Sequence, residues 1–160
     1  MGTLFEHPVV VLALALLLLP VAGFAMASVS GWRALARAYP ERPDPSPREL
    51  RYQSVRTGRG VRLQGIVHLR CGLDALRFSI VFPLSLFSPP FSVPWREIRA
   101  TALSRLLFEE IELRFDGCPE VPLYVHRALA RQLGGASRGR FTPPPVIVGG
   151  AGATGSERRK

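Results

Sequence analysis

Near the middle of the chain, a base, a thiol and a carboxylate follow one another closely, at His68, Cys71 and Asp74. Nucleophilic catalysis by a thiol requires a base within hydrogen-bond reach. The surrounding residues alternate between apolar and polar types, which predicts a strand. Along a strand an odd spacing places His68 and Cys71 on opposite faces. We therefore expect no catalytic pair here, and we expect Cys71 to be a small core residue.

Three further patterns could mark a cofactor or metal site. A Gly-x-Gly-x-x-Gly pattern ends at Gly155, with five residues after it. The dinucleotide fingerprint needs a following helix and an acidic residue about 20 positions on, so this match is excluded. Glu109, Glu110 and Glu112 beside Arg114 predict a solvated strand face. The two cysteines have no zinc-type spacing. We expect no catalytic, cofactor-binding or metal-binding residue, and no cofactor.

The chain is strongly basic, with 21 Lys and Arg against 12 Asp and Glu and a net charge of +9. Arg56, Arg59 and Arg62 cluster around the first predicted hairpin, which makes them candidate contacts for anionic lipid headgroups. The alternative is an arginine-rich face that is only solvated. Nucleic acid binding is disfavoured, because only Tyr52 lies close enough in the sequence to stack on a base.

A long apolar segment near the N-terminus predicts a membrane anchor. Residues 8 to 29 carry no charge. As a helix, these residues would span roughly 33 Å at about 1.5 Å per residue. The hydrocarbon core of a bilayer is about 30 Å thick. We therefore predict a transmembrane helix over residues 8–30, in the bacterial inner (cytoplasmic) membrane as a single pass.

The flanking residues predict the orientation of this anchor. Trp32, Arg33 and Arg37 follow the apolar segment, at positions expected to meet the membrane interface. Positive charge after the helix, with Glu6 before it, predicts that the C-terminal domain is cytoplasmic. The sequence from Ala25 to Ala27 also has the small-x-small form of a signal-peptidase site, which leaves open an exported chain with a cleaved signal peptide.

The remaining residues divide into three further regions. Residues 31–48 predict a juxtamembrane helix that ends at Pro40, followed by a proline-rich linker. Residues 49–134 predict a β domain with a C-terminal helix over residues 126–133, and residues 135–160 predict a disordered basic tail rich in Gly and Pro. We expect strands at residues 52–56, 61–71, 76–82, 91–95, within 99–108, 110–115 and 121–125.

Two segments then carry a family resemblance. Gly31 to Tyr39 after the apolar helix, and Val93 to Ile98 after a strand, resemble small uncharacterised bacterial single-pass membrane proteins with a pleckstrin-homology (PH) or GRAM-like domain. The resemblance implies an N-terminal transmembrane α-helix followed by a mainly-β PH-like barrel of about seven antiparallel strands with one C-terminal helix. It implies no catalytic residues. Trp95 is expected to be a buried core anchor.

These observations favour a non-enzymatic, membrane-anchored binding or scaffold module with a PH-like domain facing the cytoplasm. Its expected partners are the lipid bilayer and either anionic lipid headgroups or a membrane protein. The alternative is an exported periplasmic β domain with a cleaved signal peptide and a structural envelope role. A third reading, an accessory subunit of a membrane enzyme complex, is not separated from the first by sequence.

Overall fold

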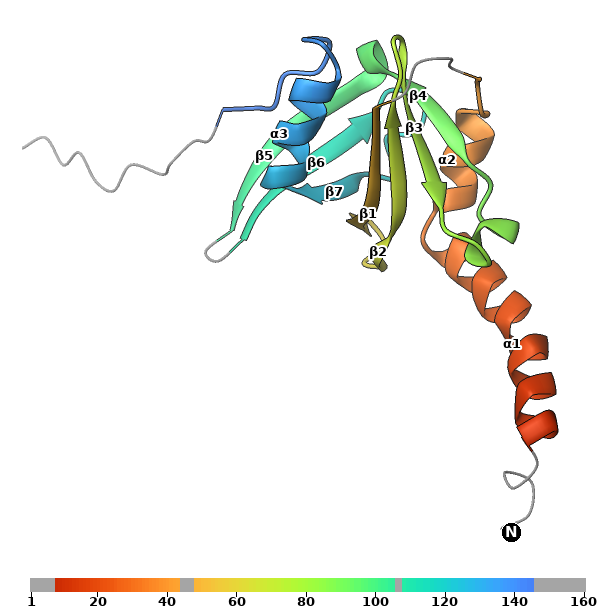
Figure 1. Ribbon diagram of the computed structural model, residues 1–160. Coiled ribbons are helices and arrows are strands. Elements are labelled where there is room, and N and C mark those ends of the chain that lie inside the picture. Colours follow the sequence, from red (N-terminus) through yellow and green to blue (C-terminus); the bar gives the residue numbers. More distant parts are fainter. Residues whose placement is uncertain (1–7, 44–47, 106–107, 146–160) are drawn as a thin grey trace, which may run out of the picture.

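A computed structural model describes residues 8–43, 48–105 and 108–145 (Figure 1). All seven described strands join one antiparallel sheet in the order β4-β3-β2-β1-β7-β6-β5. The strands are β1 (Arg48–Thr57), β2 (Arg62–Cys71), β3 (Ala75–Ile80), β4 (Phe91–Pro94), β5 (Ile98–Arg105), β6 (Phe108–Phe115) and β7 (Leu123–His126). The helices are α1 (Pro8–Val29), α2 (Trp32–Ala38) and α3 (Arg127–Ala136), with short 3-10 helices η1 (Leu84–Leu86) and η2 (Trp95–Glu97).

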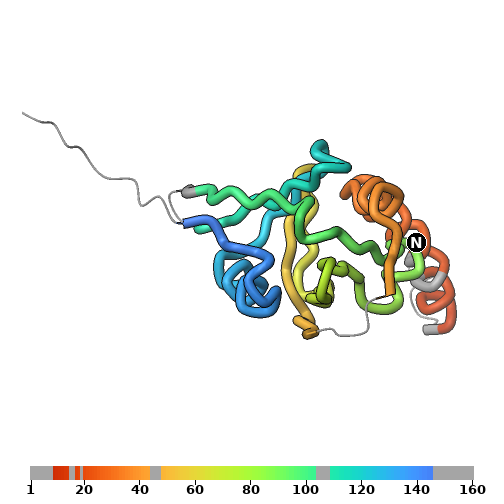
Figure 2. Tube along the Cα trace, turned by 90° about the horizontal axis from the view of Figure 1, so that it is seen from above, coloured from red at the N-terminus to blue at the C-terminus, as the bar shows by residue number. Residues whose placement is uncertain are grey.

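The sheet is strongly curled and forms a half-barrel (Figures 1 and 2). Strands that follow one another in the chain are neighbours in the sheet, except for β4 and β5. β1 also pairs with β7 and so joins the two halves of the sheet. β4 and β5 form the two edges, and η2 connects them. The expected closed barrel is therefore corrected to an open, curled seven-stranded sheet.

The alternation predicted for β2 is confirmed. Leu63, Val67, Leu69 and Cys71 are buried on one face of this strand. His68 lies on the other face, where its ring meets Tyr52 edge-on at 5.1 Å. The odd spacing therefore separates His68 from Cys71, as the strand period requires.

The C-terminal helix covers the inner side of the curled sheet. In α3, Leu129, Ala130 and Leu133 are buried against the core. The helix begins one residue after His126, whose ring Nδ1 accepts a hydrogen bond from the Ala128 amide at 3.3 Å. The folded domain extends past the predicted boundary at residue 134. Phe141 is also buried, and the centre of its ring lies 6.1 Å from the centre of the Trp95 ring. The predicted tail beyond residue 145 lies outside the described residues.

The segment expected to link membrane and domain belongs to the core. Trp32 of α2 is fully buried, its indole Nε1 donates to the Pro89 carbonyl at 2.9 Å, and its ring packs edge-on against Phe91 at 4.9 Å. Tyr39 is buried as well, and its hydroxyl accepts a hydrogen bond from the Gly117 amide at 2.5 Å. α2 is thus a structural part of the β domain.

The predicted transmembrane helix over residues 8–30 is wrong. Within the ranges that the structure describes, no helix combines the length and apolar character that a membrane crossing needs. α1 does form, but its C-terminal turns pack on the domain. A Cβ at Gly23 would lie 2.8 Å from the Phe87 ring, and Ala27 is only 1% exposed. Part of the apolar segment therefore packs against the domain and belongs to its fold.

Candidate functional site

The first predicted site residue, Arg56, is committed to its own sheet. Its side chain is 24% exposed and forms an ion pair with Glu110 of β6, with Nε 3.3 Å from Oε1. Its guanidinium also lies 4.1 Å from the centre of the Tyr124 ring. The hydrogen bond to Glu110 is the main cause that raises the pKa of Arg56. Arg56 therefore acts as a cross-strand link, with little freedom to meet a lipid headgroup.

The other two hairpin arginines are exposed. Arg62 is the ladder partner of Arg56, and Arg59 lies in the turn between β1 and β2. Neither has an ion pair with another described residue. The hairpin thus offers two exposed positive charges instead of three, and the charge of Arg59 contributes to lowering the pKa of Glu120. Arg56 and Arg62 line one groove of about 460 Å³ together with Glu110 and Tyr124.

The three predicted interface residues separate into two groups. Trp32 points into the core, and its side chain is fully buried. Arg33 is partly buried, with its guanidinium 4.7 Å from the centre of the Phe24 ring on α1. Arg37 is exposed. Only the two arginines therefore remain available at the junction between α1 and the domain.

A continuous apolar surface covers α1 and the adjoining loop between β3 and β4. α1 packs beside η1, and Gly23 lies against Phe87 of the same loop. Phe82 is 77% exposed and Leu86 is 67% exposed. We call this the apolar surface, and its members are Val9, Val10, Val11, Leu12, Leu14, Leu17, Leu18, Val21, Phe24, Phe82 and Leu86. The α1 segment that carries nine of them contains no charged residue.

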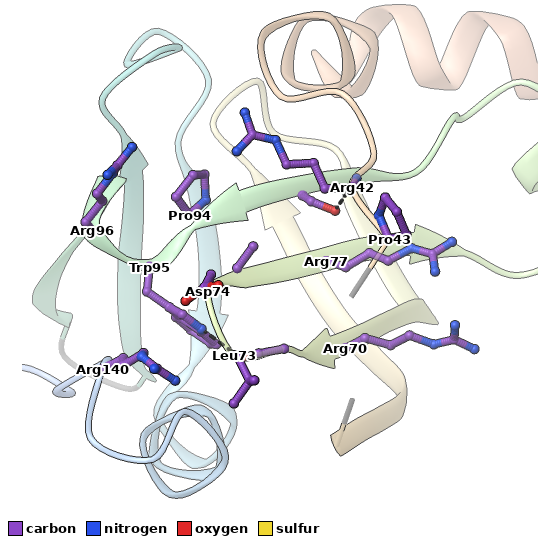
Figure 3. Close-up of a pocket in the computed structure, with 13 residues that line it drawn as sticks. Arg42, Pro43, Arg70, Leu73, Asp74, Arg77, Pro94, Trp95, Arg96 and Arg140 are labelled. Atoms are coloured by element: carbon purple, nitrogen blue, oxygen red, sulfur yellow. Dashed lines mark hydrogen bonds between the residues drawn. The ribbon is translucent and has the colours of Figure 1, made fainter. Parts of the chain in front are cut away.

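A groove of about 760 Å³ opens at the turn between β2 and β3 (Figure 3). The turn, β4, the segment after α2 and the segment after α3 all contribute to its walls. Five arginines and one aspartate supply its charged side chains. Figure 3 shows the Arg140 side chain near Trp95, while the guanidinium groups of Arg70 and Arg77 extend together away from Asp74 and Trp95. Its lining residues are Arg42, Pro43, Arg70, Gly72, Leu73, Asp74, Ala75, Arg77, Ser92, Pro94, Trp95, Arg96 and Arg140.

The walls of this groove are fixed by hydrogen bonds. The Trp95 indole Nε1 donates to the Gly72 carbonyl at 3.1 Å, and the Trp95 amide donates to the Asp74 carbonyl at 3.0 Å. The Arg42 amide donates to the Ser92 hydroxyl at 3.2 Å, which ties the segment after α2 to β4. Trp95 is buried and confirms the prediction of a core anchor.

Two of the groove arginines oppose each other across the sheet. Arg70 of β2 and Arg77 of β3 are direct ladder partners, and like charges in this position are destabilising. Glu49 lies 3.2 Å from Arg70, and Glu41 lies 2.5 Å from Arg77. The Nε atom of Arg77 is buried without a hydrogen-bond partner in the structure. The two carboxylates therefore offset this like-charge contact, and one donor of Arg77 is left without an acceptor.

The positive surface continues beyond the groove. A neighbouring cleft of about 330 Å³ shares Leu73 and Arg140 with the groove and adds Arg48 and Arg138. We call the whole set the basic groove. Its arginines are Arg42, Arg48, Arg70, Arg77, Arg96, Arg138 and Arg140. Sequence analysis missed it because these residues are scattered over almost one hundred positions. One signal of the groove in the sequence is that Arg70 and Arg77 both fall on the polar face of adjacent predicted strands.

The thiols are poorly suited to nucleophilic chemistry. Both cysteines are free and buried. Burial raises the pKa of Cys71 to about 11 and is also the main cause that raises the pKa of Cys118 to about 11. The thiolate is the reactive form of cysteine. At neutral pH both groups are therefore protonated.

The acidic side chains of β6 are engaged with cations. Glu109 pairs with Arg127 at 2.5 Å, and Glu110 pairs with Arg56. Glu112 is buried, accepts a hydrogen bond from the Tyr124 hydroxyl at 3.2 Å and lies 3.1 Å from Arg114. The prediction of a solvated strand face is wrong for Glu112. No group of three metal-ligating side chains occurs among the described residues, and the glycine pattern ending at residue 155 lies outside them.

In comparisons with known proteins, the chain matches no protein-family model and no curated protein.

Proposed function

We propose that this chain is a non-enzymatic binding module that acts at the surface of a lipid bilayer. The observation that carries this proposal is the apolar surface on α1 and the β3–β4 loop. Full burial of a large aliphatic or aromatic side chain contributes about 1.5–3 kcal/mol relative to exposure. Contiguous exposed apolar surfaces of this kind mark sites that an apolar phase or a partner covers.

The distribution of exposed residues on α1 favours lipid over a protein groove. Val9, Val10, Val11 and Leu12 are consecutive and all exposed, so they point to every side of the helix. A helix that binds in a protein groove presents one apolar stripe. Contact on all sides is what an apolar liquid phase provides. The proposal concerns contact with lipid and makes no claim that the helix crosses the bilayer.

Charge supports a location at the cytoplasmic face of a bacterial inner membrane. The net charge of +9 favours the anionic cytoplasmic leaflet, where each basic residue near the surface contributes about 1 kcal/mol. Arg33 and Arg37 lie directly after α1 and are available for such contacts. In the exported alternative, cleavage after Ala27 would remove Gly23, which lies against Phe87, and Ala27, which is buried in the fold. We therefore favour a chain that retains α1.

The β domain supports a role in binding. A curled antiparallel sheet with a helix after its last strand is compatible with a PH-like domain, a type of domain that commonly serves in recognition. The buried thiols with raised pKa, and the pairing of Glu109, Glu110 and Glu112 with arginines, also favour a non-enzymatic role.

Flotation with lipid vesicles tests the lipid contact. The full-length chain should float with neutral phosphatidylcholine vesicles, and it should still do so at 1 M salt, where the Debye length is about 3 Å. The double variant Leu17→Gln with Phe82→Gln should lower the partition coefficient about tenfold or more, because two exposed apolar contacts are lost.

A matched double variant provides the control for this experiment. Tyr52→Gln with Leu73→Gln removes two exposed apolar side chains outside the apolar surface and should leave flotation unchanged within about twofold. The proposal fails if the wild-type chain stays in the soluble fraction with neutral and anionic vesicles alike. It also fails if the two double variants lose flotation equally.

A further inference from the structure

We propose that the basic groove binds an acidic, extended peptide segment of a partner protein. The groove is a second site, distinct from the apolar surface. β3 leads from the turn at the groove to the loop that carries Phe82, so the two sites lie at opposite ends of this strand. Six strand residues separate them by roughly 20 Å at about 3.3 Å per residue.

The charges of the groove are unbalanced in favour of an anion. Its two clefts are lined by seven arginines and one carboxylate, Asp74. Arg42 and Arg140 are exposed, and neither forms an ion pair with another described residue. A guanidinium can bind a carboxylate through two parallel hydrogen bonds, so each of these arginines presents a ready site.

The like-charge contact within the sheet points in the same direction. Arg70 and Arg77 face each other across the ladder, and the buried Nε of Arg77 lacks an acceptor. A ligand carboxylate that lies over the two guanidinium groups would reduce this repulsion. Arg70 and Arg77 are paired with Glu49 and Glu41, and Arg96 lies 3.8 Å from Glu97. The positive charge that is not ion-paired with another described residue therefore comes from Arg42, Arg48, Arg138 and Arg140.

Apolar side chains between the arginines define the second requirement on the partner. Leu73 is 38% exposed on the turn, and Pro43 and Pro94 form part of the same walls. A ligand that consists of charge alone would leave these surfaces in water. A peptide that carries both acidic and apolar side chains would meet both kinds of surface.

Two other anionic partners fit the groove less well. Single-stranded nucleic acid binds through exposed aromatic platforms. The one aromatic residue in the lining, Trp95, is buried, and its Nε1 is bonded to Gly72. A flat bilayer would contact protruding side chains, whereas this site is concave and lies away from α1 (Figures 1 and 3).

Fluorescence anisotropy with a defined probe tests the proposal. The full-length chain is kept in neutral detergent, which covers the apolar surface and makes the measurement independent of vesicle binding. The probe is a fluorescein-labelled octapeptide of alternating glutamate and leucine, and its control carries glutamine in place of glutamate. The glutamate peptide should bind at least tenfold more tightly than the glutamine peptide.

Two double variants of equal charge then locate the site. Arg42→Gln with Arg140→Gln should weaken binding of the glutamate peptide about tenfold or more, because two charged contacts are lost. Arg59→Gln with Arg62→Gln removes the same charge from the hairpin and should change binding less than about twofold. Circular dichroism confirms that both variants are folded.

Three results would overturn the proposal. Equal weakening by the two double variants would mean that binding follows net charge. Equal binding of the glutamate and glutamine peptides would remove the requirement for an anion. A labelled oligothymidylate that binds more tightly than the glutamate peptide, and loses binding in the Arg42 and Arg140 variant, would reassign the groove to nucleic acid.

Discussion

The two ends of this molecule expose opposite chemistry. Around α1 and η1, large apolar side chains such as Phe82 and Leu86 face outward, and no charged residue interrupts the helix. Around the turn between β2 and β3, guanidinium groups surround a groove of about 760 Å³ (Figure 3). The apolar end is suited to contact with a fluid phase such as lipid. The basic end has fixed walls and charges at defined positions.

This difference is the basis of the two proposals above, which assign a different kind of contact to each end of the molecule. The apolar end needs area and gains little from geometry. The basic end needs geometry, which the hydrogen bonds of Trp95 and Arg42 to the turn and to β4 supply. Such a division suits an adaptor that holds a partner near a membrane.

The largest expected effect concerns the junction between the two ends. Trp32 is fully buried between α1 and the sheet, so Trp32→Ala should lower the free energy of unfolding by about 3–5 kcal/mol. Denaturant unfolding followed by circular dichroism measures this change. The same substitution should also release α1 from the domain and increase its cleavage by a protease.

A small loss of stability in Trp32→Ala would contradict the view that the apolar end and the basic groove belong to one rigid fold. If Trp32→Ala costs less than about 1 kcal/mol, α2 is a linker, and the apolar end is not held in a fixed relation to the groove. Arg37→Ala is the matched control on the same helix. Arg37 is exposed, and its loss should change stability by less than about 0.5 kcal/mol.

A smaller difference in stability is expected between substitutions of Arg56 and Arg62 in the hairpin. Arg56→Gln removes a half-buried ion pair with Glu110 and the contact with Tyr124, and should cost about 1–2 kcal/mol of stability. Arg62→Gln, at the partner position of the ladder, should be neutral within about 0.5 kcal/mol or slightly stabilising, because it removes a like charge beside Arg56. Urea unfolding of both variants decides this point, and equal losses would contradict it.

The strands were predictable because their signals are local. Alternation of apolar and polar residues placed β2 and its buried face, with Cys71 inside and His68 outside. The strands predicted at residues 110–115 and 121–125 correspond to β6 and β7. The helix after β7 was predicted to end at Leu133 and in fact ends at Ala136. In each case a short segment carries enough information to fix its own structure.

The two tryptophans show where local signals fail. Trp95 was assigned to the core because apolar strand residues surround it. Trp32 was assigned to a membrane interface because it follows an apolar segment, yet it is the more deeply buried of the two. Its partners, Pro89 and Phe91, lie almost sixty positions further along the chain. No local pattern reports such a contact.

The arginine sites illustrate the same limit. Arg56, Arg59 and Arg62 were recognised because they are close in sequence, but the fold pairs Arg56 with Glu110 of a distant strand. The basic groove collects its arginines from the segment after α2, from β1, β2, β3 and η2, and from the chain after α3. Only the topology of the sheet brings them together.

Recruitment of the acidic peptide to vesicles tests the central claim most directly. Labelled glutamate–leucine peptide is mixed with the full-length chain and neutral phosphatidylcholine vesicles, and its flotation is measured. The account predicts that peptide floats only when the protein is present, and that it stays behind with either Arg42→Gln/Arg140→Gln or Leu17→Gln/Phe82→Gln. Peptide that remains unfloated while the wild-type protein floats would contradict the account.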